Sequence, residues 1–167
     1  MPNQEKILDS IDRKLIAALQ VNCKTTLGEM GKLVGLKPPS VMERVRKLET
    51  AGVIKGYHAQ VDPRLVGHDI TAFIGVTIQY PKGADDFKDL LADPRILECH
   101  HVTGRHTLQL KVRTHNTVEL EKLIRRLRSL DGVENSETTV VLSTWSERMY
   151  APVGTSEDDG GNTRAKR

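Results

Sequence analysis

Several residue patterns on which other classes of protein depend are missing from this sequence. Its two cysteines, Cys23 and Cys99, lie far apart and outside any CxxC pair, so neither a disulfide framework nor a structural zinc site is indicated. No apolar run approaches the roughly 20 residues that span a bilayer. The first ten residues lack the basic and then apolar pattern of a secretory signal. We therefore expect a cytoplasmic protein with no membrane partner.

Signatures of catalysis and of metal binding are also missing. The sequence has no nucleophile elbow, P-loop or dinucleotide-binding glycine motif. Cys99, His100, His101 and His106 invite a metal site, but on a strand Cys99 and His101 would share one face and His100 would point the other way. No helical HxxxH accompanies them. We therefore expect no catalytic residues, no bound metal and no cofactor, and the protein is predicted not to be an enzyme.

Positive charge is concentrated in the first third of the chain. The whole chain carries a formal net charge of +3, whereas residues 1–60 alone hold ten Lys/Arg against six Asp/Glu. Residues 61–150 hold twelve against thirteen, and residues 151–167 hold three of each. A local basic excess is expected of a module that binds phosphates, although it also occurs on ordinary surfaces.

Three short helices are predicted within the first 52 residues. The first has an apolar residue at every third or fourth position and Asp9 as its N-terminal cap. The second spans about residues 26–34, is capped by a threonine, and ends at Gly35, where a left-handed backbone costs glycine little. The third begins near Pro38, which suits a first helical turn, and ends at Gly52.

The second and third of these helices form a helix-turn-helix pattern. A tight turn at Gly35-Leu36 joins them, and the third helix carries basic residues off its apolar stripe. The alternative is an ordinary small helical bundle, but a recognition helix needs one apolar face and one cationic face. We predict that the third helix enters the major groove of double-stranded DNA.

Roles can be assigned along this predicted recognition helix. Ser40 and Glu43 project from its first turns toward base edges, and Arg44 could pair with guanine. Arg44 could instead pair within the domain with Glu43 or Glu49. Phosphate contacts are predicted for three other cations, Lys37, Arg46 and Lys47.

The remainder of the chain predicts an α+β domain. A short strand is expected at 53–61, and alternation with period two predicts a strand from Ile70 to Tyr80 with the even-numbered residues on one face. Helical stripes follow near 87–91 and after Asn116. Three further strands are predicted at 96–103, 107–114 and 133–145.

The order strand-helix-strand-strand-helix-strand is that of a ferredoxin-like βαββαβ domain. Its two helices can cover one sheet face, and a second copy of the chain is the simplest cover for the other. The predicted organisation is a winged or simple helix-turn-helix domain at 1–56, a connector at 57–69, the βαββαβ domain at 70–150 and a disordered tail at 151–167.

Several of these segments together resemble the Lrp/AsnC family of transcription regulators. Residues 8–16, LDSIDRKLI, resemble the opening signature of the family, and residues 34–37, 41–49 and 52–54 match its helix-turn-helix. Farther along, CHHVTG at 99–104 and the strand that begins at Gly132 look like its sheet turn and final strand. The resemblance covers about residues 8–146 in a consistent order, and the order is more specific than any single motif.

The resemblance implies a cytoplasmic, nucleoid-associated regulator that binds DNA as a dimer or a higher assembly, often an octamer. It further implies that the second domain, of the RAM type, forms the dimer and that a small effector, usually an amino acid, binds near the sheet turn. The residues implicated are Thr103, Gly104, Arg105, His106, Thr107, Ser136 and Thr138.

Two departures from the family pattern bear on these expectations. Lys37 replaces a serine that the family commonly has before its recognition helix, which removes a capping hydroxyl and adds a charge. Arg105 and Thr107 occupy turn positions that are often acidic. The effector site is therefore expected to prefer a different ligand or to bind none.

Two other function classes remain open at this point. Sirohaem decarboxylases are similar in overall fold to these regulators, but they have no DNA groove to read, so the cations of the third helix favour the regulator. A stand-alone amino-acid sensor acting on a protein partner would account for the sheet domain, but it would leave the first sixty residues without a function.

Overall fold

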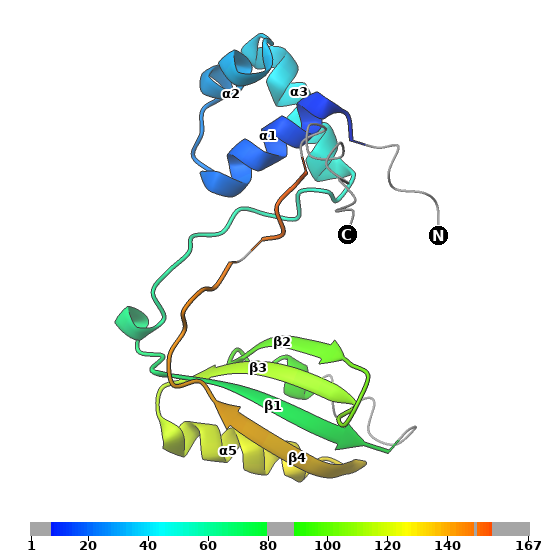
Figure 1. Cartoon of the computed structure of the whole chain (residues 1–167), viewed down its shortest axis with the longest axis vertical. Coiled ribbons are helices and arrows are strands. Elements are labelled where there is room, and N and C mark those ends of the chain that lie inside the picture. Colours follow the sequence, from blue (N-terminus) through cyan, green and yellow to red (C-terminus); the bar gives the residue numbers. More distant parts are fainter. Residues whose placement is uncertain (1–7, 80–88, 149, 155–167) are drawn as a thin grey trace, which may run out of the picture. The chain divides into compact units, whose positions relative to one another are not determined.

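The chain divides into two units, each described by itself. The computed structural model describes residues 8–79, 89–148 and 150–154. One unit contains residues 1–59 and 147–167, and the other contains residues 60–146 (Figure 1). No helix in the described ranges has the length and apolar character needed to cross a membrane.

The first two helices of the N-terminal unit are both fixed by capping boxes. Helix α1 (Ser10–Val21) has Asp9 as its cap, and α2 (Leu27–Val34) has Thr26. In α2 the Thr26 hydroxyl accepts from the Glu29 backbone N–H at 3.3 Å, and the Glu29 carboxylate accepts from the Thr26 N–H at 2.8 Å. The bond from the Thr26 N–H, and next a bond from the Thr26 hydroxyl to the same carboxylate, hold the pKa of the Glu29 carboxyl below its usual value. The two capping bonds also satisfy backbone donors that the helix leaves unpaired.

The turn between α2 and α3 (Pro38–Thr50) depends on two glycines. Gly35 has a φ of 72°, in the left-handed region that the sequence predicts for it. A Cβ on Gly31 would lie 2.5 Å from the carbonyl oxygen of Leu36, so a side chain there would push the turn away from α2. The turn is therefore tight enough for Leu15, Met30 and Val41 to form one buried cluster.

The strand predicted at 53–61 is absent, and this prediction is wrong. Residues 55–62 have no regular secondary structure, and the next element is a single 3-10 turn, η2 (Arg64–Val66). A suitable sequence alone cannot make a strand, because the backbone N–H and C=O groups of a strand need a neighbouring strand as partner. No described strand pairs with this segment, so the helix-turn-helix has no wing here.

The second unit is a four-stranded antiparallel sheet with the order β2-β3-β1-β4. Its strands are β1 (Ile70–Ile78), β2 (Ile96–His101), β3 (Leu108–Thr114) and β4 (Val133–Val140). Helix α5 (Thr117–Arg128), capped by Asn116, connects β3 to β4. Residues 89–91 are helical before β2, and the rest of the helix predicted near 87–91 lies outside the described residues. The order confirms the predicted α+β fold.

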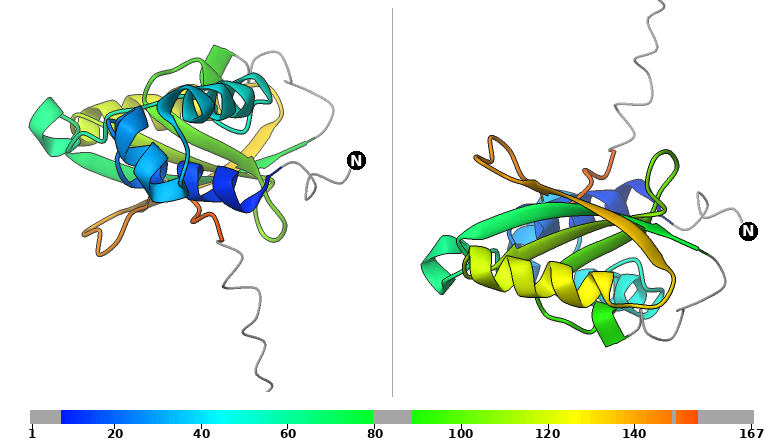
Figure 2. Two further views of the ribbon diagram at one scale, coloured as in Figure 1. Left: turned by 90° about the horizontal axis from the view of Figure 1, so that it is seen from above. Right: turned by 90° about the horizontal axis from the view of Figure 1, so that it is seen from below.

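The two faces of the sheet differ sharply in polarity. Ala72, Ile74 and Val76 of β1 are fully buried and pack with Leu123 and Leu127 of α5. Figure 2 shows α5, in yellow, lying along this face of the sheet. The opposite face of the strands has no described helix over it. It presents polar residues and a partly exposed phenyl ring, namely Phe73, Glu98, His100, Gln109, Lys111, Glu137 and Thr139.

A short C-terminal segment belongs to the N-terminal unit. The Gln20 side-chain amide donates to the Ala151 carbonyl at 2.9 Å, and Arg13 donates to the Gly154 carbonyl at 3.3 Å. Both donors lie on α1 seven residues apart, so residues 151–154 run antiparallel to this helix. The tail predicted to be disordered began at 151. Residues 151–154 are thus anchored on α1, and residues 155–167 lie outside the described part.

Candidate DNA interface and effector region

Helix α3 has one buried side and one exposed side, as the sequence predicts. Val41 and Leu48 are buried against the rest of the N-terminal unit. Ser40, Glu43 and Lys47 lie on the exposed side at helical spacing. The Glu43 and Lys47 side chains are 67% and 74% exposed and form an i,i+4 ion pair of 2.8 Å, which holds the pKa of Glu43 below its usual value. Such an exposed pair is easily exchanged for contacts to another molecule.

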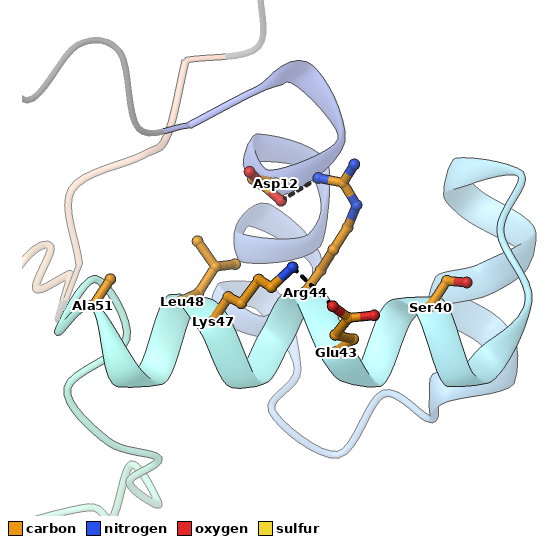
Figure 3. A pocket seen from close by; sticks show the side chains of 7 residues that line it. All are labelled: Asp12, Ser40, Glu43, Arg44, Lys47, Leu48 and Ala51. Carbon is orange, nitrogen blue, oxygen red and sulfur yellow. Dashed lines mark hydrogen bonds and ion pairs between the residues drawn. The ribbon is translucent and has the colours of Figure 1, made fainter.

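A groove with both polar and apolar lining lies beside this exposed side, and Figure 3 shows the side chains that line it. Leu48 and Ala51 provide its apolar part, and both signs of charge surround it. Its polar lining consists of Asp12, Ser40, Glu43, Arg44 and Lys47. The groove therefore places four predicted base or phosphate contacts beside each other, together with Asp12, a carboxylate from α1 to which the sequence analysis gives no such role.

Arg44 faces α1 and does not pair with Glu43 or Glu49. Its Nη1 lies 2.6 Å from Oδ2 of Asp9 and 2.8 Å from Oδ1 of Asp12. Figure 3 shows the guanidinium reaching from α3 to Asp12 on the neighbouring helix. These carboxylates raise the pKa of Arg44, Asp12 contributing most. The charge of Arg44 is thus already balanced within the unit.

The two remaining predicted cations lie at the start of α3 and in its second half. Lys37 is the N-terminal cap of α3 and makes no side-chain capping bond, as the replacement of a serine implies. Arg46 is exposed in the second half of the helix. Both side chains are exposed and add to the cationic character of α3.

The turn between β2 and β3 contains five of the predicted effector residues. Gly104, at its tip, has a φ of 107°, a conformation that side chains rarely adopt. Thr103 and Arg105 are exposed beside it. Thr107 closes the turn, because its carbonyl accepts from Val102 N–H at 3.0 Å and its own N–H donates to Val76 at 2.9 Å.

His106 lies on the open face of the sheet, against Gly75 of β1. A Cβ on Gly75 would be 2.3 Å from the His106 ring, so the ring occupies the space that a side chain would fill. Its Nε2 lies 3.4 Å from Oε2 of Glu137, and Arg105 Nη1 lies 3.2 Å from the same oxygen. The buried Nδ1 has no hydrogen-bond partner in the described structure. The side chains of Arg105 and His106 therefore both lie against the Glu137 carboxylate.

Ser136 and Thr138 lie on the other side of the sheet from this cluster. They pair with Val76 and Ile74, whose side chains face α5. Ser136 is buried, and its hydroxyl accepts from Arg128 Nε at 2.8 Å. The structure thus brings the turn residues 103–107 together but separates them from the two β4 residues.

The cysteine and histidine residues near β2 do not converge on a metal position. Cys99 and His101 pair with Leu110 and Leu108 on the helix-covered side, whereas His100 pairs with Gln109 on the open side. Burial raises the pKa of the Cys99 thiol, which disfavours the thiolate that binds metals. Within the described ranges, no group of three or more His, Cys, Asp or Glu side chains is placed to hold an ion.

Three residues contribute to these sites in ways that the sequence expectations leave out. The sequence predicts Asp9 as the cap of α1, but the ion pairs of Asp9 and Asp12 with Arg44 depend on how α1 crosses α3. Gly75 lies against His106, and a glycine in a central strand is a recognised sign of close approach by another group. That signal could have identified Gly75, whereas nothing local could have paired Asp12 with Arg44.

Two family models match most of the chain. Residues 8–49 match an AsnC-type helix-turn-helix domain, and residues 71–151 match an Lrp/AsnC ligand binding domain. The HTH-type transcriptional regulator FL11 of Pyrococcus horikoshii is 37% identical over 146 residues, which cover 87% of this chain and 97% of FL11. Regulatory protein AsnC of Escherichia coli is 30% identical, with 87% and 97% covered.

Solved structures of similar proteins agree in fold. A transcriptional regulator from Neisseria meningitidis in complex with L-methionine has a TM-score of 0.80 at 28% identity and covers 87% of this chain and 96% of its own. A feast or famine regulatory protein from Mycobacterium tuberculosis, also complexed with L-methionine, has a TM-score of 0.79 at 34% identity, with 87% and 99% covered. These relatives are regulators, so the enzymatic alternative is not favoured.

Proposed function

Because this chain belongs to the Lrp/AsnC family of helix-turn-helix transcriptional regulators, we propose that it binds double-stranded DNA by inserting α3 into the major groove. The observation that carries this proposal is the division of α3 into a side anchored by Val41 and Leu48 and a side that exposes Ser40, Glu43 and Lys47. A helix of this kind can enter a groove without losing its packing on the domain.

We assign the contacts by position along the exposed side. Ser40 and Glu43 meet base edges, since a hydroxyl can contact several bases and a carboxylate accepts from the cytosine amino group. Phosphate contacts come from the cations Lys37, Arg46 and Lys47. Binding requires Lys47 to exchange its 2.8 Å pair with Glu43 for a phosphate, which leaves Glu43 free to face a base.

Fluorescence anisotropy of the full chain on a duplex from its own promoter region, measured over a series of salt concentrations, tests this assignment. Lys47→Gln is expected to weaken binding and to reduce the salt slope by about one. Lys122→Gln, an exposed lysine on α5, is the matched control and should leave both unchanged. If Lys47→Gln and Arg46→Gln both leave the affinity and the slope unchanged, α3 is not the contacting element.

We further propose that a small molecule, an amino acid in the first instance, binds at the turn 103–107. Two similar regulators have structures with L-methionine, and this turn gathers exposed polar groups around Gly104. Ser136 and Thr138 lie outside this proposed binding site, because they face α5. Calorimetric titration with L-methionine and L-leucine is expected to show saturable binding that Arg105→Ala weakens; no heat with any amino acid would contradict this part of the proposal.

The open face of the sheet supports a proposed homodimer. Phe73 is 39% exposed in the middle of this face, and removing an apolar ring from water is favourable. We propose that a second copy covers it and that dimers associate further. Light scattering after gel filtration should give at least a dimer for the wild type and a smaller species for Phe73→Asp; a monomeric wild type would contradict the proposal.

A further inference from the structure

The shared ion pairs of Arg44 suggest a role for it other than reading DNA. Both carboxylates that it contacts also belong to the capping box of α1. Oδ1 of Asp9 accepts from the Asp12 backbone N–H at 2.8 Å, and Oδ2 of Asp12 accepts from the Asp9 N–H at 3.3 Å. The remaining oxygen of each carboxylate accepts from Nη1 of Arg44, at 2.6 and 2.8 Å. Each of the four oxygens therefore has a partner.

This arrangement joins the middle of α3 to the first turn of α1. Nη1 carries two hydrogens, and both are used by the two carboxylates. The Asp12 side chain is 13% exposed and that of Arg44 32%, so water only partly screens the pairs. The Asp9 pKa is held below its usual value, first by the Asp12 backbone N–H and then, against the opposing effect of burial, by Arg44.

The apolar contacts of α3 have no preferred direction, whereas its ion pairs do. Leu15, Met30 and Val41 form the buried cluster of the described residues, and partly buried aliphatic side chains pack around it. A guanidinium held by two carboxylates adds hydrogen bonds that need a defined geometry, so it constrains the rotation of α3 more sharply. Small rotations of α3 would move Ser40 and Glu43 relative to the bases.

We propose that Arg44 is a positioning residue, which locks the DNA-contacting helix to the capped end of α1 and does not itself read a base. This inference rests on the proposed function of α3. It predicts that the affinity for DNA depends on Asp12, a carboxylate on a different helix that would repel phosphates if it acted only through its charge.

The test compares duplex affinities of full-length Asp12→Asn, Arg44→Gln and the double variant, at a temperature at which circular dichroism shows each to be folded. Each single change is expected to weaken binding about tenfold, and the double change also about tenfold instead of a hundredfold, because both remove the same interaction. The salt slope and the base preference should stay as in the wild type, since no phosphate or base contact is lost.

Glu29→Gln is the matched control. It weakens the equivalent capping box of α2, to which Arg44 does not contribute, so it should lower thermal stability without changing the affinity of the folded protein. A purely structural role of Arg44 would give the same pattern for Arg44→Gln as for this control. If Arg44→Gln does not fold, Arg44→Lys, which keeps one cation for two carboxylates, should show a smaller loss of affinity with the same slope.

Several outcomes would overturn the inference. Unchanged binding by Asp12→Asn would mean that the ion pair with Arg44 does not position α3 for DNA. Tighter binding would mean that Arg44, once released, contacts the DNA itself, as a base-reading arginine would. A change in preference at a single base pair in Arg44→Gln would mean the same. A wild-type protein that binds no duplex at low salt would instead contradict the proposed function, and this inference with it.

Discussion

The two units of the chain are stabilised by different kinds of contact. The N-terminal unit buries a cluster of three side chains, whereas the buried cluster of the sheet unit contains ten, among the residues that the structure describes. The N-terminal unit has two complete capping boxes and an arginine shared by two carboxylates. Apolar burial is the larger source of stability where it is available. Polar contacts therefore contribute more to the orientation of the helices in the N-terminal unit than in the sheet unit.

Each unit also contains a group of three paired charges. In the sheet unit one carboxylate pairs with two cations, and in the N-terminal unit one cation pairs with two carboxylates. In the sheet unit one carboxylate, Asp93, pairs with Arg95 at 2.6 Å and Arg126 at 3.2 Å, and its side chain is 4% exposed. In the N-terminal unit one cation pairs with two carboxylates that are 51% and 13% exposed. Ion pairs gain strength as water is removed, so the Asp93 group should contribute more to stability.

The largest expected effect is on the apolar core of the sheet unit. Leu123→Ala removes a fully buried side chain between α5 and the sheet and should lower the free energy of unfolding by about 3 kcal/mol. Calorimetry at a fixed protein concentration should show this loss in the transition of the sheet unit alone. A single transition that shifts as a whole would mean that the two units do not unfold separately.

The next effect concerns Asp93, whose pKa is lowered to about 2, first by the side-chain bond from Arg95. Because the folded pKa lies below the unfolded value, this stabilisation is complete above about pH 4 and is lost as the pH falls toward 2. Asp93→Asn should therefore cost about 2 kcal/mol at neutral pH and much less near pH 2. Urea unfolding at both pH values measures this; an equal cost at both would contradict it.

A smaller effect is expected from the cap of α2. Thr26→Ala removes the hydroxyl that accepts from the Glu29 N–H and should lower the stability of the N-terminal unit by about 1 kcal/mol. Ser10→Ala is the control, because Ser10 is the first residue of α1 and Asp9 is its cap. Thermal unfolding followed by circular dichroism should separate the two variants, and equal midpoints would mean that the Thr26 cap contributes little.

The smallest effect, and one of opposite sign, is expected at the uncapped start of α3. Lys37→Ser supplies a capping hydroxyl and should stabilise the N-terminal unit by about 0.5 kcal/mol. It should also weaken DNA binding, because a phosphate contact is lost. Lys37→Ala separates the two consequences, since it should weaken binding equally without the gain in stability. Equal stability of the serine and alanine variants would show that no cap forms.

Much of the fold could be predicted because its signals are local. Ala72, Ile74 and Val76 of β1 are buried and Ile70 and Ile78 half-buried, as their alternation predicts. Helix α1 begins at its predicted cap, Asp9, α2 is capped by a threonine as predicted, and α5 begins after Asn116 as predicted. Capping depends on residues three positions apart, and alternation depends on the geometry of a single strand. The strand predicted at 53–61 did not form because its existence depended on a partner strand elsewhere.

The candidate sites were predictable only in part, for the same reason. The sequence by itself determined that α3 has an apolar and a cationic side, because a helix fixes which residues share a face. Only the tertiary structure decided that Arg44 meets Asp9 and Asp12, that His106 lies on Gly75, and that Ser136 faces α5. These contacts join residues far apart in the chain, and the packing of whole elements, not any local pattern, brings such residues within bonding distance.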